Sequence, residues 1–394
     1  MNHLPVYFDH NATSPVHAEV LKAMEPFWEV LYGNPSSIHR AGGEVARELR
    51  RARQRVASFL GVQDESEIIF TSGGTESNNT VFRSALWTGK GKPRIVTTSV
   101  EHSSVLKLAR ALQEEGVEIT VVPVSEQGDL DRGKLRAAIS NEVALVSVMM
   151  ANNETGVIFP VEEIAREVRE KGALFHVDAV QAVGKIPFSL GKLPVDFLSL
   201  SAHKFGGPKG IGALYVRKGT PFRPFVFGGG QERGRRAGTE NVPGIVGLGA
   251  ACDRLQKNLS QEIQKVKELR DNFEREVLGS ISSVQINGNR QNRLPNTSNL
   301  AFEGVDTEAL LILLDEEQVC ASSGSACLSG APEPSHVLRA MGFSNERTRS
   351  SVRFSFGAQN TQGEIRQVAK LLERFVSRLR EIDLKEQHPH PTVQ

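Results

Sequence analysis

A lysine, a carboxylate and a histidine each lie at the end of an apolar run that has the length and composition of a buried β-strand. Lys204 follows FLSLSA, Asp178 ends LFHVD, and His102 lies where a strand gives way to a helix. Lysine is the residue that forms Schiff bases with carbonyl compounds. A carboxylate can hold the proton of a ring nitrogen, and histidine can stack on a flat ring or move protons near neutral pH. Ligands of open α/β sheets gather beyond the carboxyl ends of strands, so the three groups could act together.

Two glycine-containing segments could bind a phosphate. The turn T-S-G-G-T-E-S-N-N at 71–79 leads from a strand into a helix that starts near Thr75, and glycine turns and helix N-termini offer backbone N–H groups to an anion. The turn matches neither the P-loop nor the dinucleotide fingerprint, which disfavours nucleoside triphosphates. The basic, glycine-rich segment 228–241 includes Thr239, which could meet a phosphate of the same or a neighbouring subunit.

Amide and guanidinium side chains could orient the rest of such a ligand. Gln181 could reach a phenolic oxygen, Asn153 could position a ring or a carboxylate, and Arg353 lies in an alternating strand and could bind a carboxylate through two hydrogen bonds. Each candidate also has a plainer explanation, such as a surface lysine, a capping aspartate or histidine, an ordinary turn, or a surface arginine. Together, however, they are the set that an aldehyde cofactor with a phosphate requires, namely pyridoxal phosphate (PLP).

One cysteine lies where a cysteine cannot pack well. Cys327 belongs to A-S-S-G-S-A-C-L-S-G at 321–330, whose glycines and serines offer no apolar face. The usual role of a small buried hydrophobe suits Cys252 and Cys320 but not this residue. A reactive thiolate is usually partly exposed, and a segment rich in glycine and serine can swing. The pattern therefore predicts a nucleophile on a mobile segment.

The bulk composition excludes several classes of function. The chain has 394 residues, 39% of them hydrophobic, and a net charge of +1, so no strong field would recruit nucleic acid or a membrane surface. Three cysteines argue against a disulfide framework and favour a reducing compartment, so we expect a cytoplasmic protein. The N-terminus lacks a signal-peptide core, and no apolar run is long enough to span a bilayer. We expect no metal site.

Short apolar runs alternate with amphipathic helical patterns from about residue 65 to 217, which predicts an α/β fold with right-handed crossovers. Several runs are nearly all apolar, as in strands buried on both faces of a mostly parallel sheet. The expected strands are EIIFTS, RIVTTSV, EITVVPV, ALVSVMM, LFHVDA, FLSLSA and GALYVR.

The pattern changes after residue 255. A long charged helix at about 260–278 precedes short strands near VQIN, TSNLAF and SVRFSF, and two helices follow, near TEALLILLDEE and EIRQVAKLLERFVSRLREI. This order of helices and short strands predicts a smaller α+β domain. We expect a large domain at 15–255, and a small domain at 1–14 and 256–394 that carries the mobile cysteine segment.

In order and spacing, these motifs resemble those of the cysteine desulfurases, which are class-V aminotransferases of PLP fold type I. The resemblance extends from about Tyr7 to Arg380, and its motifs are T-S-G-G-T-E-S, E-H-S-S, N-N-E-T-G, H-V-D-A-V-Q, S-A-H-K with G-P-K-G, R-R-A-G-T-E-N and S-S-G-S-A-C. The cysteine motif is similar to that of the group with the longer catalytic loop, which includes nitrogen-fixation and housekeeping iron–sulfur types. The resemblance implies a large domain with a mostly parallel seven-stranded sheet, a small α+β domain and a homodimer.

The resemblance also implies a role for each candidate residue. Lys204 would hold PLP as a Schiff base and shuttle the α-proton of L-cysteine, and Cys327 would take the sulfur as a persulfide, leaving L-alanine. Because the persulfide must leave the site to meet an acceptor, its cysteine has to travel. Asp178 would pair with the pyridine nitrogen and Gln181 with the phenolic oxygen, while His102 would stack on the ring and assist proton transfers. The other implied residues are Gly74, Thr75, Ser201 and His203 at the phosphate, Thr239 reaching it from the partner subunit, Asn153 beside cofactor and substrate, and Arg353 at the substrate carboxylate.

Two departures from the family pattern concern the movement of the cysteine segment and the identity of the sulfur acceptor. Leu328 stands after the cysteine where a small polar residue is more usual, and the C-terminus QHPHPTVQ lacks the longer tail by which housekeeping members dock their scaffold. An iron–sulfur scaffold or another sulfur-acceptor protein stays open as the partner, as do nitrogenase, general iron–sulfur and tRNA thiolation pathways. The alternatives are a selenocysteine lyase or an aminotransferase of the same fold, or a non-catalytic partner in sulfur assembly.

Overall fold

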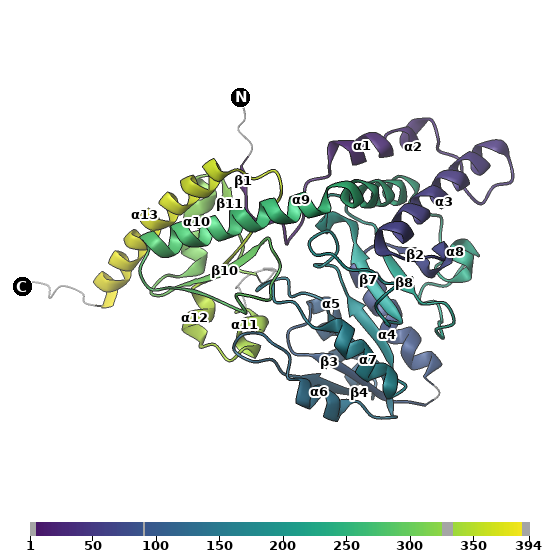
Figure 1. Ribbon diagram of the computed structural model, residues 1–394, viewed down its shortest axis with the longest axis horizontal. Coiled ribbons are helices and arrows are strands. Elements are labelled where there is room, and N and C mark those ends of the chain that lie inside the picture. The colour runs from purple at the N-terminus through teal and green to yellow at the C-terminus, as the bar shows by residue number, and fades with distance from the viewer. Residues whose placement is uncertain (1–4, 90, 325–333, 388–394) are drawn as a thin grey trace, which may run out of the picture.

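The computed structural model describes residues 5–89, 91–324 and 334–387, and it shows two packed parts joined by a long helix (Figure 1). The larger part is built on a seven-stranded sheet in the order β2-β8-β7-β6-β5-β3-β4. Strand β8 is antiparallel to β2 and β7, and the other neighbours pair in parallel. The strands are β2 (Ile68–Thr71), β3 (Arg94–Thr98), β4 (Glu118–Val122), β5 (Val143–Met149), β6 (Leu174–Asp178), β7 (Phe197–Ser201) and β8 (Gly212–Val216). The predicted α/β fold with a mostly parallel sheet is confirmed.

Helices cover both faces of this sheet because its central strands are apolar on both sides. Every residue of β5 is buried. One face packs on apolar side chains of α3 (Arg40–Leu60), α7 (Val161–Glu170) and α9 (Val242–Ser280). The other face packs on α4 (Gly74–Thr88) and α5 (Ser103–Glu114). The polar groups that follow the strands therefore have one place to gather, the edge formed by the carboxyl ends.

The smaller part is an antiparallel three-stranded sheet, in the order β12-β10-β9, packed on helices. Its core gathers Phe273, Phe302 and Phe354 with apolar residues of the helices around them. The N-terminal β1 pairs in parallel with β11, and Asp9 then bridges to Ser355, so the first described residues belong to this part. The elements are β1 (Val6–Tyr7), β9 (Val284–Ile286), β10 (Thr297–Phe302), α10 (Thr307–Glu316), β11 (Val319–Cys320), β12 (Ser351–Ser355) and α13 (Gln362–Gln387).

Helix α9 contributes to the cores of both parts. It has 39 residues and starts at Val242, well before the helix that the sequence predicts at 260–278. Asn241 caps it by accepting a hydrogen bond from the Gly244 N–H at 3.1 Å. Since the helix passes residue 255 without a break, the domain boundary placed there stays a prediction.

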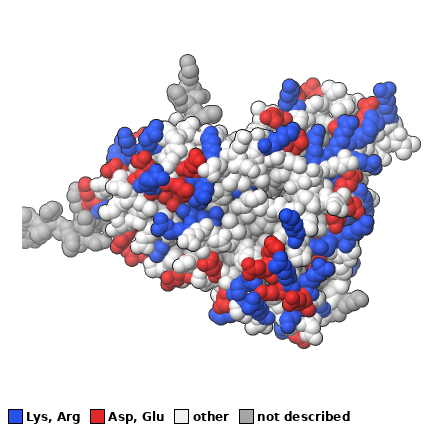
Figure 2. Space-filling model, viewed as in Figure 1, with Lys and Arg blue, Asp and Glu red and all other residues white. Residues whose placement is uncertain are grey.

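Short helices complete the chain. They are α1 (Ala18–Met24), α2 (Pro26–Glu29), η1 (Glu65–Glu67), α6 (Arg132–Ala138), η2 (Ala202–Lys204), α8 (Gln231–Gly234), α11 (His336–Ala340) and α12 (Asn345–Arg349). In the part of the chain that the structure covers, no helix has the length and apolar character needed to cross a bilayer. Acidic and basic side chains are interspersed over the face that Figure 2 shows.

Candidate active site

A cavity of about 350 Å³ lies beyond the carboxyl ends of the parallel strands and reaches the smaller part of the molecule. It brings together nearly all the residues that the sequence singles out, from both parts of the chain. The predicted residues that line it are Gly74, Thr75, His102, Asn153, Asp178, Gln181, Ser201, His203, Lys204 and Arg353.

Lys204 ends the short helix η2, directly after β7. Its Nζ donates hydrogen bonds to the backbone oxygens of Asn11 and Ala12, each at 2.7 Å. Burial, and to a smaller extent the positive charge of Arg353, lowers the pKa of Lys204 to about 8. A larger fraction of this amine is therefore neutral near pH 7 to 8 than of a surface lysine, and the neutral amine is the form that attacks a carbonyl carbon.

Asp178, the last residue of β6, is held by two hydrogen bonds. Its Oδ2 accepts one from Asn78 Nδ2 at 2.8 Å, and its Oδ1 accepts one from the Val180 N–H at 3.0 Å. The residues that follow form turns rather than a helix, so the residue is no helix N-cap. The contacts hold the carboxylate in one orientation, with one edge in the cavity.

His102 combines a capping role with a place in the cavity. It is the N-cap of α5, where its Nδ1 accepts a hydrogen bond from the Ser104 N–H at 3.1 Å. An accepting Nδ1 leaves the proton of the neutral ring on Nε2. The ring lines the cavity. The protein around it removes water, which lowers the pKa of His102, and this effect outweighs the nearby charge of Asp178, which raises the pKa. The imidazole is thus a neutral, oriented ring.

The N-terminus of α4 closes one end of the cavity. Gly73 has a φ of 153°, and a Cβ added to Gly74 would lie 2.6 Å from Val180 Cγ2, so larger residues would not fit this turn. A second hollow, of about 350 Å³, continues here and is lined by Ser201, His203 and Lys209 among others. Helix N–H groups, the Ser201 hydroxyl and the Lys209 ammonium form a donor set suited to a phosphate.

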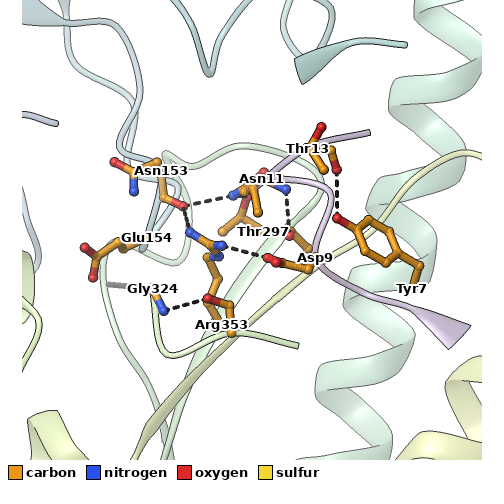
Figure 3. Close-up of polar contacts among 12 residues, drawn as sticks. Tyr7, Asp9, Asn11, Thr13, Asn153, Glu154, Thr297, Gly324 and Arg353 are labelled. Atoms are coloured by element: carbon orange, nitrogen blue, oxygen red, sulfur yellow. Dashed lines mark hydrogen bonds and ion pairs between the residues drawn. The ribbon is translucent and has the colours of Figure 1, made fainter. Parts of the chain in front are cut away.

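Arg353 comes from β12 in the smaller part and is 4% exposed. Its Nη2 donates to Asp9 Oδ1 at 2.7 Å, and its Nη1 donates to the backbone oxygen of Asn153 at 3.1 Å (Figure 3). Its Nε is buried and has no hydrogen-bond partner within the described ranges. Because the guanidinium lines the cavity and each Nη keeps a second N–H, it can pair with a ligand carboxylate there.

Asn11 also lines the cavity, and the sequence analysis did not single it out. Its Nδ2 donates to Thr297 Oγ1 at 2.8 Å and to the Asn153 oxygen at 3.1 Å, so it ties the N-terminal segment to both parts (Figure 3). Its backbone oxygen accepts from Lys204 and, at 2.9 Å, from Gln181 Nε2. The polar run DHNAT directly after the first strand was a usable signal, since it matches the polar strand ends elsewhere.

Glu154 is a second residue that the sequence analysis did not single out. It is 1% exposed, and its Oε2 accepts a hydrogen bond from Ser335 Oγ. A Cβ added to Gly324, whose φ is 89°, would lie 2.8 Å from the same oxygen. Burial raises the pKa of Glu154. The described residues on both sides of segment 325–333 therefore pack against one carboxyl group.

Among the predicted residues that the structure describes, Thr239 does not line the cavity. Thr239 is exposed in the 228–241 segment, whose neighbouring residues are anchored by two ion pairs, Glu232 with Arg53 and Arg236 with Glu76. Cys327 lies outside the described residues. Of the other cysteines, Cys252 is buried and Cys320 partly buried, and burial raises the pKa of both thiols.

Known proteins share this fold and sequence over nearly the whole chain. The profile of the aminotransferase class-V family matches residues 6–368. A solved structure of a NifS-like protein superposes with a TM-score of 0.87 at 40% identity, covering 96% of this chain and 99% of that one. A structure described as SspA in complex with cysteine has a TM-score of 0.76 at 31% identity, covering 90% and 100%. The chain therefore belongs to the class-V aminotransferases.

Curated relatives narrow this class. The cysteine desulfurase of Trichormus azollae is 49% identical over 375 residues, covering 95% of this chain and 94% of that protein. Cysteine desulfurase NifS of Azotobacter vinelandii is 46% identical over 377 residues, covering 96% and 94%. Within the class, the chain is a member of the cysteine desulfurase family, whose members use PLP bound to a lysine. The predicted family is confirmed.

Proposed function

We propose that this protein is a PLP-dependent cysteine desulfurase that converts L-cysteine to L-alanine and takes the sulfur on Cys327. The proposal rests on one observation above the others: the Lys204 amine and the Asp178 carboxylate face a single cavity. That cavity is closed at one end by the N-terminus of α4 and reaches Arg353 of the smaller part.

The residues present fit PLP. The tight turn at Gly73 and Gly74, with Thr75, Ser201 and His203, would hold the phosphate. Lys204 would bind the aldehyde, Asp178 the pyridine nitrogen and Gln181 the phenolic oxygen, and His102 would stack on the ring. Bound there, PLP supplies an electron sink that makes the α-carbon of an amino acid acidic and weakens its bond from β-carbon to sulfur.

The protein's own groups would do the remaining work. Arg353 would bind the substrate carboxylate through its guanidinium, which lines the cavity, with Asn153 beside it. The Lys204 amine would carry the α-proton, since a pKa of about 8 lets it both accept and release a proton near neutral pH. The neutral His102 ring would assist with later protons.

Sulfur transfer would be a displacement at the substrate sulfur. The Cys327 thiolate would attack that sulfur, so that an S–S bond forms while the bond from sulfur to the β-carbon breaks. The bonding electrons would stay with the carbon skeleton, which takes up protons and leaves as alanine. The persulfide would then pass to an iron–sulfur scaffold or another acceptor protein.

The oligomeric state and the location are part of the same proposal. The exposed Thr239 would reach the phosphate of a partner subunit, which makes the working unit a homodimer. We place the protein in the cytoplasm. We also propose that 15–255 form the cofactor-binding domain, while 1–14 and 256–394 form the domain that carries the nucleophile.

Parallel measurement of alanine and sulfide from L-cysteine, with dithiothreitol as sulfur acceptor, tests this function. We expect equal amounts of both from the wild type, no product and a visible spectrum that differs from the wild type's band near ~400 nm from Lys204→Ala, and loss of sulfide with an intact band from Cys327→Ala. Sulfide from Cys327→Ala would refute that nucleophile. Keto-acid production would favour an aminotransferase, turnover of selenocysteine alone a lyase, and a PLP-loaded protein without turnover an assembly partner.

A further inference from the structure

Lys185 is a buried amine beside the site that the proposed function leaves without a role. It lies four residues after Gln181 and is 8% exposed. Its Nζ donates to Asn11 Oδ1 at 2.9 Å and to Gln181 Oε1. A lysine this deeply enclosed is uncommon, because removing the amine from water costs free energy that its partners must offset.

The partners of Lys185 decide which way two amide groups point. Asn11 Nδ2 donates to Thr297 Oγ1 and Asn153, which fixes Asn11 Oδ1 as an acceptor. Gln181 Nε2 donates to the Asn11 backbone oxygen at 2.9 Å, so Gln181 Oε1 is the atom left for Lys185. Two N–H groups suffice for these acceptors. The arrangement therefore also serves a neutral amine, which burial favours by lowering the pKa of Lys185.

We propose that Lys185 is a positioning residue: it holds the Gln181 amide so that its nitrogen, and not its oxygen, is available to the cofactor cavity. The inference rests on the proposed function, because the phenolic oxygen of PLP is the acceptor that Gln181 would meet there. A hydrogen-bond donor that is held in place stabilises the phenolic oxygen as an anion. It would therefore lower the pKa of the proton that this oxygen shares with the Lys204 nitrogen bound to PLP. A freely rotating amide would present its oxygen part of the time.

The contacts of Asn11, the second partner of Lys185, support the same role. Lys204 and Gln181 both donate to the Asn11 backbone oxygen, and Lys185 binds the side-chain oxygen of the same residue. Asn296 Nδ2 also donates to that side-chain oxygen, at 3.1 Å. Removing the Lys185 amine would thus leave Asn11 Oδ1 with a partner but Gln181 Oε1 with none among the residues that the structure describes, so the main effect falls on Gln181.

The test uses the pH titration of the visible band of PLP-loaded protein, which reports the cofactor proton without turnover. Gln181→Met should raise the titration midpoint by about 0.5 to 1 pH unit, the equivalent of one hydrogen bond. Lys185→Met should raise it in the same direction. The double variant should shift no further than Gln181→Met alone, because the lysine acts through that amide. Lys192→Met, at an exposed lysine seven residues further along the chain, should leave the midpoint unchanged.

Additive shifts in the double variant would mean that Lys185 acts by charge alone, and an unshifted Lys185→Met would mean that it does not act; either result overturns the inference. Should Lys185→Met fail to fold, Gln181→Glu gives a second test, since its carboxylate keeps a partner for Lys185 but carries no donor. That variant should raise the midpoint at least as far as Gln181→Met, because its negative charge opposes the anion in addition to the loss of the donor, and an unchanged midpoint would refute a donating Gln181. A wild type that takes up no PLP would refute the proposed function itself, and this inference with it.

Discussion

Replacing Arg353 by lysine separates substrate binding from the rest of the chemistry. The guanidinium contacts Asp9 through Nη2 at 2.7 Å and the Asn153 backbone oxygen through Nη1 at 3.1 Å, and each of these nitrogens keeps a second N–H for a carboxylate in the cavity. A lysine keeps the positive charge, but its single nitrogen cannot pair with Asp9 and also meet a substrate carboxylate in the same geometry. The loss is therefore one hydrogen bond to a charged group.

Such a bond contributes about 1.5 to 3 kcal/mol, which corresponds to a fall of about 10- to 150-fold in kcat/KM for L-cysteine. We expect the fall to appear mainly as a higher KM, with PLP content and visible spectrum unchanged. Sulfide release measured over a range of cysteine concentrations gives both constants. Arg349→Lys, at an exposed arginine on the neighbouring helix, is the control. A KM within about twofold of the wild-type value would refute the carboxylate role.

Two further predictions concern the loading of the cofactor. The rate at which the PLP-free protein takes up PLP should rise with pH and level off above about 8. Only the neutral Lys204 amine attacks the aldehyde, and the neutral fraction grows as the pH passes the pKa of Lys204. Stopped-flow absorbance measures this rate, and a rate that still rises in proportion to hydroxide above pH 9 would contradict the prediction. Gly74→Ala should weaken PLP binding about tenfold, since the new Cβ would lie 2.6 Å from Val180 Cγ2. Adding Val180→Ala should restore much of the affinity measured by equilibrium dialysis, and an unaffected single variant would show that the turn is not tight.

Much of the fold could be predicted because buried parallel strands are recognisable locally. All seven expected strands of the large sheet form, and the residues at their ends gather as the strand-end rule requires. The sequence indicates helical stretches at GLGAACDRLQ and at about 260–278 but not that they form one helix from Val242, because the first turns, rich in glycine and small apolar residues, lack the charged periodicity of the later ones. There, packing against the large sheet decides the helix rather than local sequence.

The polar network around the candidate site could not be predicted in the same way. Asn11 and Gln181 are 170 residues apart, and nothing local to either indicates the other. Lys185 and Glu154 look like ordinary charged residues of loops, and only the three-dimensional packing buries them. Thr239 shows the opposite case: its motif is recognisable, yet within one chain it lies away from the cavity.

The ion pair between Asp9 and Arg353 joins residues from near the two ends of the chain. Ribosomes build proteins from the N-terminus, so the strand that carries the arginine emerges among the last. The large sheet can fold while synthesis continues. Arg353, which would bind the substrate carboxylate, is made only after more than 340 residues have followed Asp9. A nascent or C-terminally truncated chain would therefore lack a complete substrate site, however well its first part had folded.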